Sequence, residues 1–268
     1  KIIIKGNNVG IKNTGNVDAY VRATVIVNYV DETDSTNRMA KKLAVGGAPE
    51  GTLAVAKRQS GGKGRLGRSF FSPEGGIYMS MVLRPTISAD RALLITTCAA
   101  VAVARAIERV CDVTAGIKWV NDIFIDGKKV CGILTEAITK FNSIESVIIG
   151  VGIDANFNVN VLSEELQEGT TTLDIELGHR VNENEIIRFF LEEFERIGIL
   201  FEEGGFERIL KEWRKYSYSI GKIVEVREPF SKSYDGYVLG ISREGALVVE
   251  KIDGTLEKVI SGECIIKK

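Results

Sequence analysis

One short segment of the chain combines glycines with fixed positive charges. Residues Gln59–Pro73 read QSGGKGRLGRSFFSP, with four glycines and three cations between two apolar runs. Glycine lets backbone N–H groups approach a ligand closely, and arginine offers forked donors to phosphate or carboxylate. The segment is therefore a candidate anion-binding loop.

Three familiar phosphate-binding loops do not fit this segment. Gly62–Gly67 matches G-x-G-x-x-G, but a dinucleotide fold needs a helix directly after the glycines, and here the strand pattern Ile77–Leu83 follows. A protein-kinase loop would require later H-R-D and D-F-G sequences, which the chain lacks. A Walker loop needs Gly-Lys-Ser/Thr, which Gly64-Arg65 does not supply. Considered alone, the segment could equally be a solvated basic hairpin loop.

A second polar group precedes a helical pattern. Asp34-Ser35-Thr36-Asn37 opens a predicted helix that runs to about Val45 and stops at Gly46-Gly47. Asp34 or Ser35 suits the N-cap position. Because a helix N-terminus also carries free backbone donors, capping and ligand binding are both compatible with these residues.

A third group surrounds a predicted tight turn. Lys118-Trp119-Val120-Asn121-Asp122 precedes Asp126-Gly127, a strong two-residue hairpin signal, and Lys129-Val130-Cys131-Gly132 follows it. A strand position two residues past the turn would fix Lys129 better than a loop would. Taken alone, Lys129 could be a surface hairpin lysine, Asp122 a turn aspartate and Trp119 a core residue.

In order and spacing, these segments together resemble the motifs of biotin protein ligases. Gln59–Pro73 resembles their biotin-binding loop, Ser35–Asn37 their Ser-Thr-Asn signature, and Lys118–Gly132 their K-W-P-N-D…K-x-x-G block; Gly150–Asn156 resembles their G-I-G-I-N-V-N run. The resemblance covers about Val25 to Lys268. It implies an enzyme that uses ATP and Mg²⁺ to convert biotin into biotinyl-5'-AMP and transfers biotin to a lysine of a biotin carboxyl carrier protein.

The resemblance also implies roles for individual residues. Lys129, Arg65 and Asp122 would be catalytic, with Lys129 bridging the biotin carboxylate and the α-phosphate and Asp122 facing the incoming lysine amine. The implied biotin-binding residues are Ser35, Thr36, Asn37, Gln59, Gly62, Lys63, Gly64, Arg65, Lys129 and Gly132. The implied ATP-binding residues are Arg65, Arg68, Phe70, Asn121, Asp122, Lys129 and Asp154. No metal ligand is assigned.

Three positions depart from the family pattern. Lys63 occupies a position where arginine is common. Lysine offers a carboxylate a single point charge instead of the forked donors of arginine, so recognition of the carboxylate is weaker. Val120 replaces the usual proline. Asp154 replaces an asparagine that meets the nucleotide in the family, and an extra anion there could either weaken nucleotide binding or recruit a metal.

Composition narrows the classes of function. The 268 residues carry 35 basic and 36 acidic side chains, a net charge of -1, which gives no general attraction to nucleic acid or anionic membranes. No apolar run approaches the roughly 20 residues of a membrane span, and no signal peptide opens the chain. Four cysteines without a C-x-x-C pair indicate free thiols in the cytoplasm, and the single His179 leaves little material for a zinc site or a Ser-His-Asp triad.

The order of the predicted elements indicates an α+β protein. Strands with helices inserted between them favour a mixed, largely antiparallel sheet covered on one face by helices, the class II synthetase-like fold of the family. From Gly221, short strands and glycine turns predict a small SH3-like barrel. The expected domains are a catalytic domain at 25–219 and a C-terminal domain at 220–268. Residues 1–24 form an extension of unclear role, too short for the DNA-binding winged helix of many relatives; an extra hairpin is the favoured interpretation.

Two other classes of function fit the sequence less well. Lipoate-protein ligases and octanoyltransferases resemble the same fold, but they show an R-R-x-x-G-G-type loop followed by a histidine, and His179 lies about a hundred residues away from the loop. A ligand-sensing or nucleic-acid-binding module is disfavoured by the near-neutral charge. The expected partner is the biotin carboxyl carrier protein of acetyl-CoA carboxylase or a related carboxylase, with no nucleic acid or membrane. The chain is expected to be a monomer or a homodimer.

Overall fold

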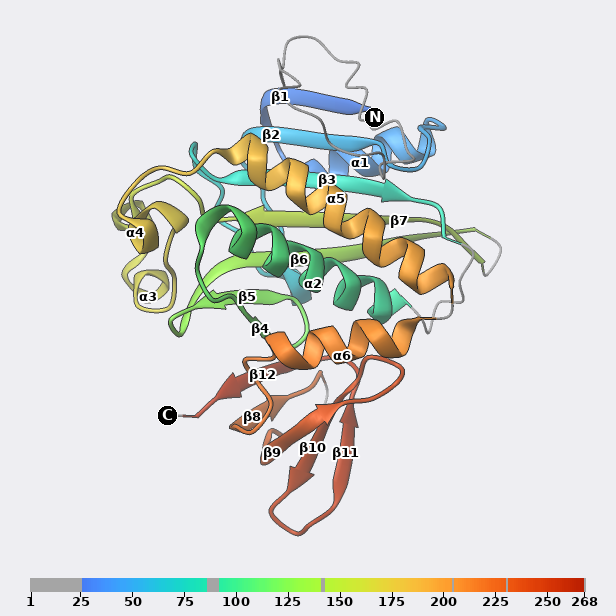
Figure 1. Ribbon diagram of the computed structural model, residues 1–268, viewed down its shortest axis with the longest axis vertical. Coiled ribbons are helices and arrows are strands. Elements are labelled where there is room, and N and C mark those ends of the chain that lie inside the picture. Colours follow the sequence, from blue (N-terminus) through green and yellow to red (C-terminus); the bar gives the residue numbers. More distant parts are fainter. Residues whose placement is uncertain (1–25, 86–91, 141–142, 204, 230, 268) are drawn as a thin grey trace.

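Two β-sheets follow one another along the chain (Figure 1). The structure is a computed structural model that describes residues 26–85, 92–140, 143–203, 205–229 and 231–267. The predicted extension at 1–24 lies outside these residues. Among the described helices, none is both long and apolar enough to cross a membrane.

The first sheet has seven strands. They are β1 (Val27–Thr33), β2 (Leu53–Gln59), β3 (Ile77–Leu83), β4 (Gly116–Lys118), β5 (Asp122–Ile125), β6 (Lys128–Lys140) and β7 (Ser143–Ile153), in the order β1-β2-β3-β7-β6-β5-β4. Strands β1 and β2 are parallel, and the other neighbouring pairs are antiparallel. A parallel pair needs a crossover, which helix α1 (Thr36–Val45) provides. The predicted mixed, largely antiparallel sheet is confirmed.

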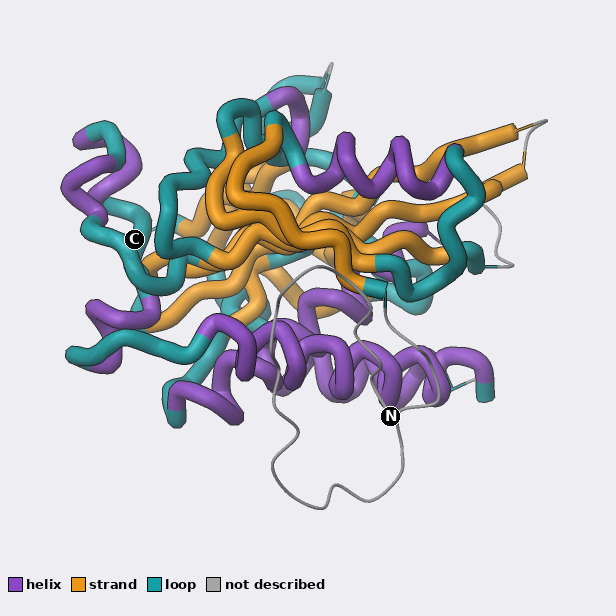
Figure 2. The backbone as a smooth tube through the Cα atoms, turned by 90° about the horizontal axis from the view of Figure 1, so that it is seen from above, coloured by secondary structure: helices purple, strands orange, loops and turns teal. Residues whose placement is uncertain are grey.

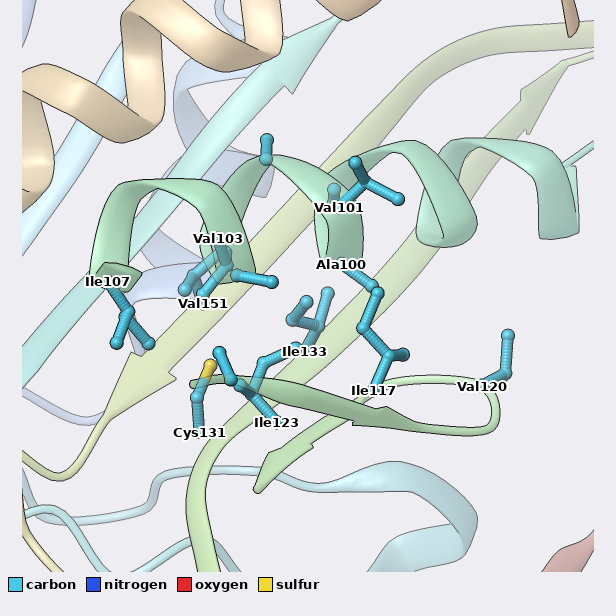
Figure 3. Packing of buried hydrophobic residues seen from close by; sticks show 14 of the residues in the cluster. Ala100, Val101, Val103, Ile107, Ile117, Val120, Ile123, Cys131, Ile133 and Val151 are labelled. Atoms are coloured by element: carbon cyan, nitrogen blue, oxygen red, sulfur yellow. The ribbon is translucent and has the colours of Figure 1, made fainter. Parts of the chain in front are cut away.

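A layer of long helices covers one face of this sheet. It contains α2 (Ala92–Cys111), α5 (Glu183–Glu202) and α6 (Phe206–Tyr216). Figure 3 shows why α2 lies close to the strands: small side chains such as Ala100 and Val103 face Ile133 and Val151 of the sheet. Arg105 of α2 pairs with acidic residues on α5 and α6, which ties the three helices together. Two shorter helices, α3 (Glu164–Gln167) and α4 (Leu173–Leu177), lie in the connection after β7.

Helix α1 packs on the opposite face, so the prediction that helices cover one face only was wrong. Ala40 and Ala44 of α1 pack against Ala54, Val82 and Ile148, while the neighbouring β2 residues belong to the core under α2. Figure 2 shows helices on both sides of the strands. The cause is visible in the sequence, because an uninterrupted apolar run at the start of β2 suits a strand that is buried on both faces.

The second sheet has five antiparallel strands. They are β8 (Ile223–Arg227), β9 (Tyr234–Ile241), β10 (Leu247–Lys251), β11 (Leu256–Val259) and β12 (Glu263–Ile266), in the order β11-β10-β9-β8-β12. This sheet is the small C-terminal β domain that the glycine turns predicted. We propose a domain boundary between α6 and β8, near residue 220.

Candidate active site

The glycine-rich segment forms an irregular hairpin at the end of β2. Isolated bridges join Gln59 to Ser72 and Lys63 to Ser69. Within the hairpin, the Gly64 N–H donates to the Arg68 carbonyl over 2.7 Å. A single 3₁₀ turn, Arg65–Gly67, forms the tip, with Leu66 in the left-handed region at φ 54°. The backbone of the loop is therefore held largely by its own hydrogen bonds.

This hairpin closes over a cleft on the sheet face that carries α1. The cleft encloses about 910 Å³ of empty space, counted out to its open mouth. The predicted site residues that line it are Ser35, Thr36, Asn37, Gln59, Lys63, Gly64, Arg65, Arg68, Phe70, Asn121, Asp122, Lys129 and Gly132. The three motifs, which are far apart in the sequence, thus meet in one pocket. Gly62 and Asp154 are the predicted residues that do not line it.

One end of the cleft is cationic. Lys129 Nζ lies 2.8 Å from Asp122 Oδ1, in the middle of a continuous polar chain. Arg65 donates to Asn121 Oδ1 over 3.0 Å, and Asn121 Nδ2 donates to Asp122 Oδ1 over 3.0 Å and to the Ile133 carbonyl over 3.1 Å. This arrangement fixes two cations beside one carboxylate.

Burial affects the two cations differently. Burial alone would lower the pKa of Lys129, but the charge and hydrogen bond of Asp122 outweigh it, so this pKa is raised. Burial lowers the pKa of Arg65, with Asp122 acting in the opposite direction. A guanidinium starts from such a high pKa that it stays charged. The site therefore keeps both positive charges at neutral pH.

The other end of the cleft is polar and neutral. The backbone N–H and hydroxyl of Thr36 both donate to Gln59 Oε1, over 2.7 and 3.1 Å. Gln59 Nε2 donates to Ser72 Oγ over 2.8 Å. Ser35 occupies the N-cap position without a side-chain capping bond, and Asp34 accepts from the Ser35 N–H instead. The Ser35 hydroxyl is thus not used as a cap.

Phe70 lies on a floor made by glycines of β6 and β7. A Cβ atom added at Gly152 would lie 2.5 Å from Phe70 Cε1, and one at Gly132 would lie 3.1 Å from Phe70 Cε2. The Lys129 ammonium is 5.9 Å from the centre of the Phe70 ring. The absence of side chains at the two glycines is what lets the ring settle between the loop and the sheet.

Trp119 serves as core and as pocket wall at once. It lines the cleft but is only 3% exposed. Its indole N–H donates to the Gly245 carbonyl over 3.0 Å, and its backbone N–H donates to Ser219 Oγ over 3.1 Å. Trp119 therefore joins the pocket to the C-terminal sheet.

Gly62 and Asp154 lie behind the cleft surface. A Cβ atom at Gly62 would lie 2.3 Å from the Phe70 carbonyl, so the close approach of the loop's own backbone requires glycine there. Asp154 is 5% exposed, and its backbone N–H donates to the Val130 carbonyl. Burial raises the pKa of Asp154 well above its ordinary value, which favours the neutral form, although the charge of Lys129 opposes this. The nucleotide contact expected of Asp154 stays a prediction.

The structure adds pocket residues that the sequence reasoning missed. Arg68 forms a two-pronged ion pair with Glu263 of β12, so the C-terminal sheet supplies part of the pocket wall. Leu134 and Gly150 line the sheet side. An alternating pattern could have found Leu134, because it is two residues beyond Gly132 on the same strand face. No local pattern indicates Glu263.

The site combines a basic glycine-rich hairpin, a mixed sheet beneath it and a small β domain that completes the pocket wall. These features are those of ligases in the Biotin/lipoate A/B protein ligase family, and residues 29–154 match the model of that family. Residues 219–267 match the Biotin protein ligase C terminal domain. The chain belongs to the biotin protein ligases.

Named relatives and a solved structure support the same family assignment. The chain is 38% identical over 236 residues to the Bifunctional ligase/repressor BirA of Bacillus subtilis, covering 88% of this chain and 72% of that protein. It is 31% identical over 222 residues to the Biotin--[acetyl-CoA-carboxylase] ligase of Paracoccus denitrificans, covering 81% and 91%. The biotin protein ligase from Aquifex aeolicus, solved in complex with biotin and ATP, superposes with a TM-score of 0.77 at 27% identity, covering 90% and 98%.

Proposed function

We propose that this chain is an ATP-dependent biotin protein ligase that makes biotinyl-5'-AMP and passes biotin to one lysine of a biotin carboxyl carrier protein. The observation that carries the proposal is the Lys129–Asp122 pair, 2.8 Å apart, at the cationic end of a cleft whose other end is polar and neutral. The carrier protein is inferred from the relatives. The name Biotin--[acetyl-CoA-carboxylase] ligase indicates the carboxylase subunit that bears biotin.

The two ends of the cleft suit the two ends of biotin. At the neutral end, Thr36, Asn37 and Gln59 present amide and hydroxyl groups that can match the ureido ring. At the cationic end, Lys129 and Arg65 would face the carboxylate and the phosphates of ATP, and Lys63 adds a further positive charge to the lining of the same cleft. Arg68, Phe70 and Asn121 would contact the nucleotide.

In the first step, a carboxylate oxygen of biotin forms a bond to the α-phosphorus of ATP, and pyrophosphate leaves with the electron pair of the broken P–O bond. The reacting groups are both anions, which repel by about 4 kcal/mol at about 4 Å and an effective dielectric constant near 20. Lys129 and Arg65 offset this repulsion and stabilise the charge that develops on the phosphorus oxygens.

In the second step, the ε-amine of the carrier lysine attacks the biotinyl carbonyl carbon, and AMP leaves. The amine must lose a proton to form the amide. Asp122, which lines the cleft beside Lys129, has a carboxylate that can orient the amine and accept this proton. Asp122 would thus act after the adenylate has formed.

Mg²⁺ fits this site only as an ion that is bound to the phosphates of ATP. Within the described ranges, no group of three or more histidine, cysteine, aspartate or glutamate residues could hold a metal ion. Asp122 and Asn121 offer oxygens beside the phosphate position, so an ion carried by the polyphosphate could gain protein ligands there. Bound Mg²⁺ would supply additional neutralisation of phosphate charge.

Other features of the setting stay proposals. A net charge of -1 supports the absence of a nucleic-acid or membrane partner. All four cysteines are buried and unpaired, which supports a cytoplasmic location. The oligomeric state is proposed as monomer or homodimer.

The test is pyrophosphate release from ATP·Mg²⁺ in the presence of biotin, octanoate or lipoate, followed by transfer to a carrier protein. We expect release that depends on biotin, and a biotinylated carrier lysine. Release that depends on octanoate or lipoate but not on biotin would overturn the proposal in favour of the lipoate branch of the family.

A further inference from the structure

Glu136 of β6 lies outside the pocket lining but touches it through Asn37. Asn37 Nδ2 donates to Glu136 Oε2 over 2.7 Å and to the Leu134 carbonyl over 3.3 Å. On the other side, Lys41 Nζ of α1 lies 2.5 Å from Glu136 Oε1. Burial alone would raise the pKa of Glu136, but the hydrogen bonds from Lys41 and Asn37 outweigh it and lower this pKa. Glu136 is therefore an ionised group that can only accept.

This acceptor decides which way the Asn37 amide points. An ionised carboxylate and the Leu134 carbonyl both need a donor, so Asn37 must offer its NH₂ group to them. Its oxygen then faces Ser80, which donates to Asn37 Oδ1 over 2.6 Å. In the flipped orientation, the amide oxygen would face two acceptors and the Ser80 hydroxyl would face the NH₂ group.

The sheet is shaped to this orientation. A Cβ atom at Gly150 would lie 2.0 Å from Asn37 Oδ1, so glycine leaves the space that the amide oxygen fills. Asn37 itself is only 5% exposed. The amide is thus enclosed by a charged partner on one side and by bare backbone on the other.

Polar groups of the glycine-rich loop lie next to this amide. Ser80 Oγ, whose single proton goes to Asn37, lies 2.8 Å from Thr36 Oγ1, and Thr36 donates to Gln59. Gln59 donates to Ser72, and Ser72 Oγ donates to the Phe70 carbonyl over 2.9 Å. Neighbouring polar groups therefore extend from the Lys41–Glu136 pair on the surface to the loop that covers the cleft.

We infer that the Lys41–Glu136 ion pair is a positioning device for recognition of the ligand's head group. Because both amide protons of Asn37 are held by Glu136 and Leu134, the ion pair leaves the amide oxygen as the acceptor at the neutral end, and so favours a cyclic urea with N–H donors over an acyl chain without one. Neither Lys41 nor Glu136 touches the ligand; both act through Asn37. This inference rests on the proposed function.

A double-mutant cycle tests it, with biotin binding measured by calorimetry on the full chain. Glu136→Met removes the acceptor at similar length and should weaken biotin binding about tenfold, or about 1.4 kcal/mol, the scale of one charge-assisted hydrogen bond. Glu136→Gln keeps an acceptor oxygen and should stay within about threefold of the wild type. In the Asn37→Ala background, Glu136→Met should cause no further loss.

Steady-state kinetics supply a readout that a general loss of structure would not produce. In Glu136→Met, the KM for biotin should rise about tenfold while kcat and the KM for ATP stay within about twofold. The matched control is Glu257→Gln, which breaks the similarly exposed Lys251–Glu257 pair in the C-terminal sheet and should change neither constant.

The outcomes separate this inference from the function on which it rests. If the wild type binds no biotin, the proposed function and the inference fall together. If the wild type binds biotin but the losses from Glu136→Met and Asn37→Ala add, the inference alone is overturned. Should Glu136→Met fail to fold, Lys41→Met replaces it in the cycle: its expected loss of about threefold must also vanish in the Asn37→Ala background.

Discussion

Lys129→Met is the substitution that bears most directly on the proposed chemistry. Methionine keeps the length and the apolar part of the side chain beside Phe70 but removes the ammonium that lies 2.8 Å from Asp122. The neighbouring Lys128 is exposed on the same strand, so Lys128→Met is a matched control that removes an equal charge.

The expected loss follows from the position of the charge. The Lys129 side chain is 29% exposed, so an effective dielectric constant near 20 is appropriate rather than that of a dry interior. A charge interaction at about 4 Å is then worth about 4 kcal/mol, which corresponds to a rate change of about 10³-fold. The variant also leaves Asp122 unpaired against the biotin carboxylate. Adding Asp122→Asn should therefore restore part of the biotin affinity but not the rate of adenylate formation.

The assay is biotin-dependent exchange of labelled pyrophosphate into ATP, which reports the first step alone. Lys129→Met should lose about 10³-fold in kcat/KM, and Lys128→Met should lose less than about twofold. Because the pKa of Lys129 is raised above its ordinary value, its positive charge is present below that value and is lost only as the pH rises through the raised pKa. The wild-type rate should accordingly show no fall due to Lys129 between about pH 7 and 9. A Lys129→Met rate within tenfold of the wild type would refute the assigned role.

Three further predictions concern the surroundings of the pocket. Gly150→Ala places a Cβ atom 2.0 Å from Asn37 Oδ1. The variant should bind biotin at least about tenfold more weakly, as measured by calorimetry, and should lose about 1–3 kcal/mol in the free energy of unfolding. Unchanged affinity would contradict the described packing. Arg68→Ala should cost about 0.5 kcal/mol of stability at pH 7, because the Arg68–Glu263 pair is partly exposed. The hydrogen bond from Arg68 lowers the pKa of Glu263, so the pair's contribution is present above the ordinary glutamate pKa and disappears as the pH falls through the lowered one. The stability difference between wild type and Arg68→Ala should therefore shrink in acid, and a constant difference in chemical denaturation would count against the pairing. Biotin with ATP·Mg²⁺ should protect Gly61–Phe70 from protease, whereas equal cleavage with and without ligands would show that the loop does not close over them.

Elements with strong local signals were predicted from the sequence. The Asp126-Gly127 turn is confirmed, with φ values of 46° and 81° that suit a two-residue hairpin. Apolar residues at 186, 187, 190, 194, 197 and 201 repeat at helical spacing, and this segment forms α5; the segment 206–216 forms α6. In each case the signal lies in neighbouring residues, where turn chemistry or hydrophobic spacing acts directly.

The remaining features depend on contacts between distant residues. Strand β12 carries Glu263 to Arg68, 195 residues earlier in the chain, and no local pattern encodes that meeting. The apolar run of β2 indicates burial on both faces, but the helix that covers the second face follows from the parallel β1–β2 pair, which periodicity alone does not reveal.

The pocket was predicted in part. Three motifs led to most of the side chains that line it, whose roles stay predictions. Glu136 and Ser80 were missed because each acts on another side chain rather than belonging to a motif.

The glycines of β6 and β7 bear on how this pocket can change over evolutionary time. Where Phe70 and Asn37 approach the sheet, the floor is bare main chain, and any replacement at Gly150 or Gly152 adds atoms to space that is already filled. Substitution at these glycines can only reduce the volume of the pocket. New acyl substrates would therefore have to be accommodated through residues that can become smaller, such as Leu134 on the same side of the cleft, while the backbone beneath remains a fixed reference surface.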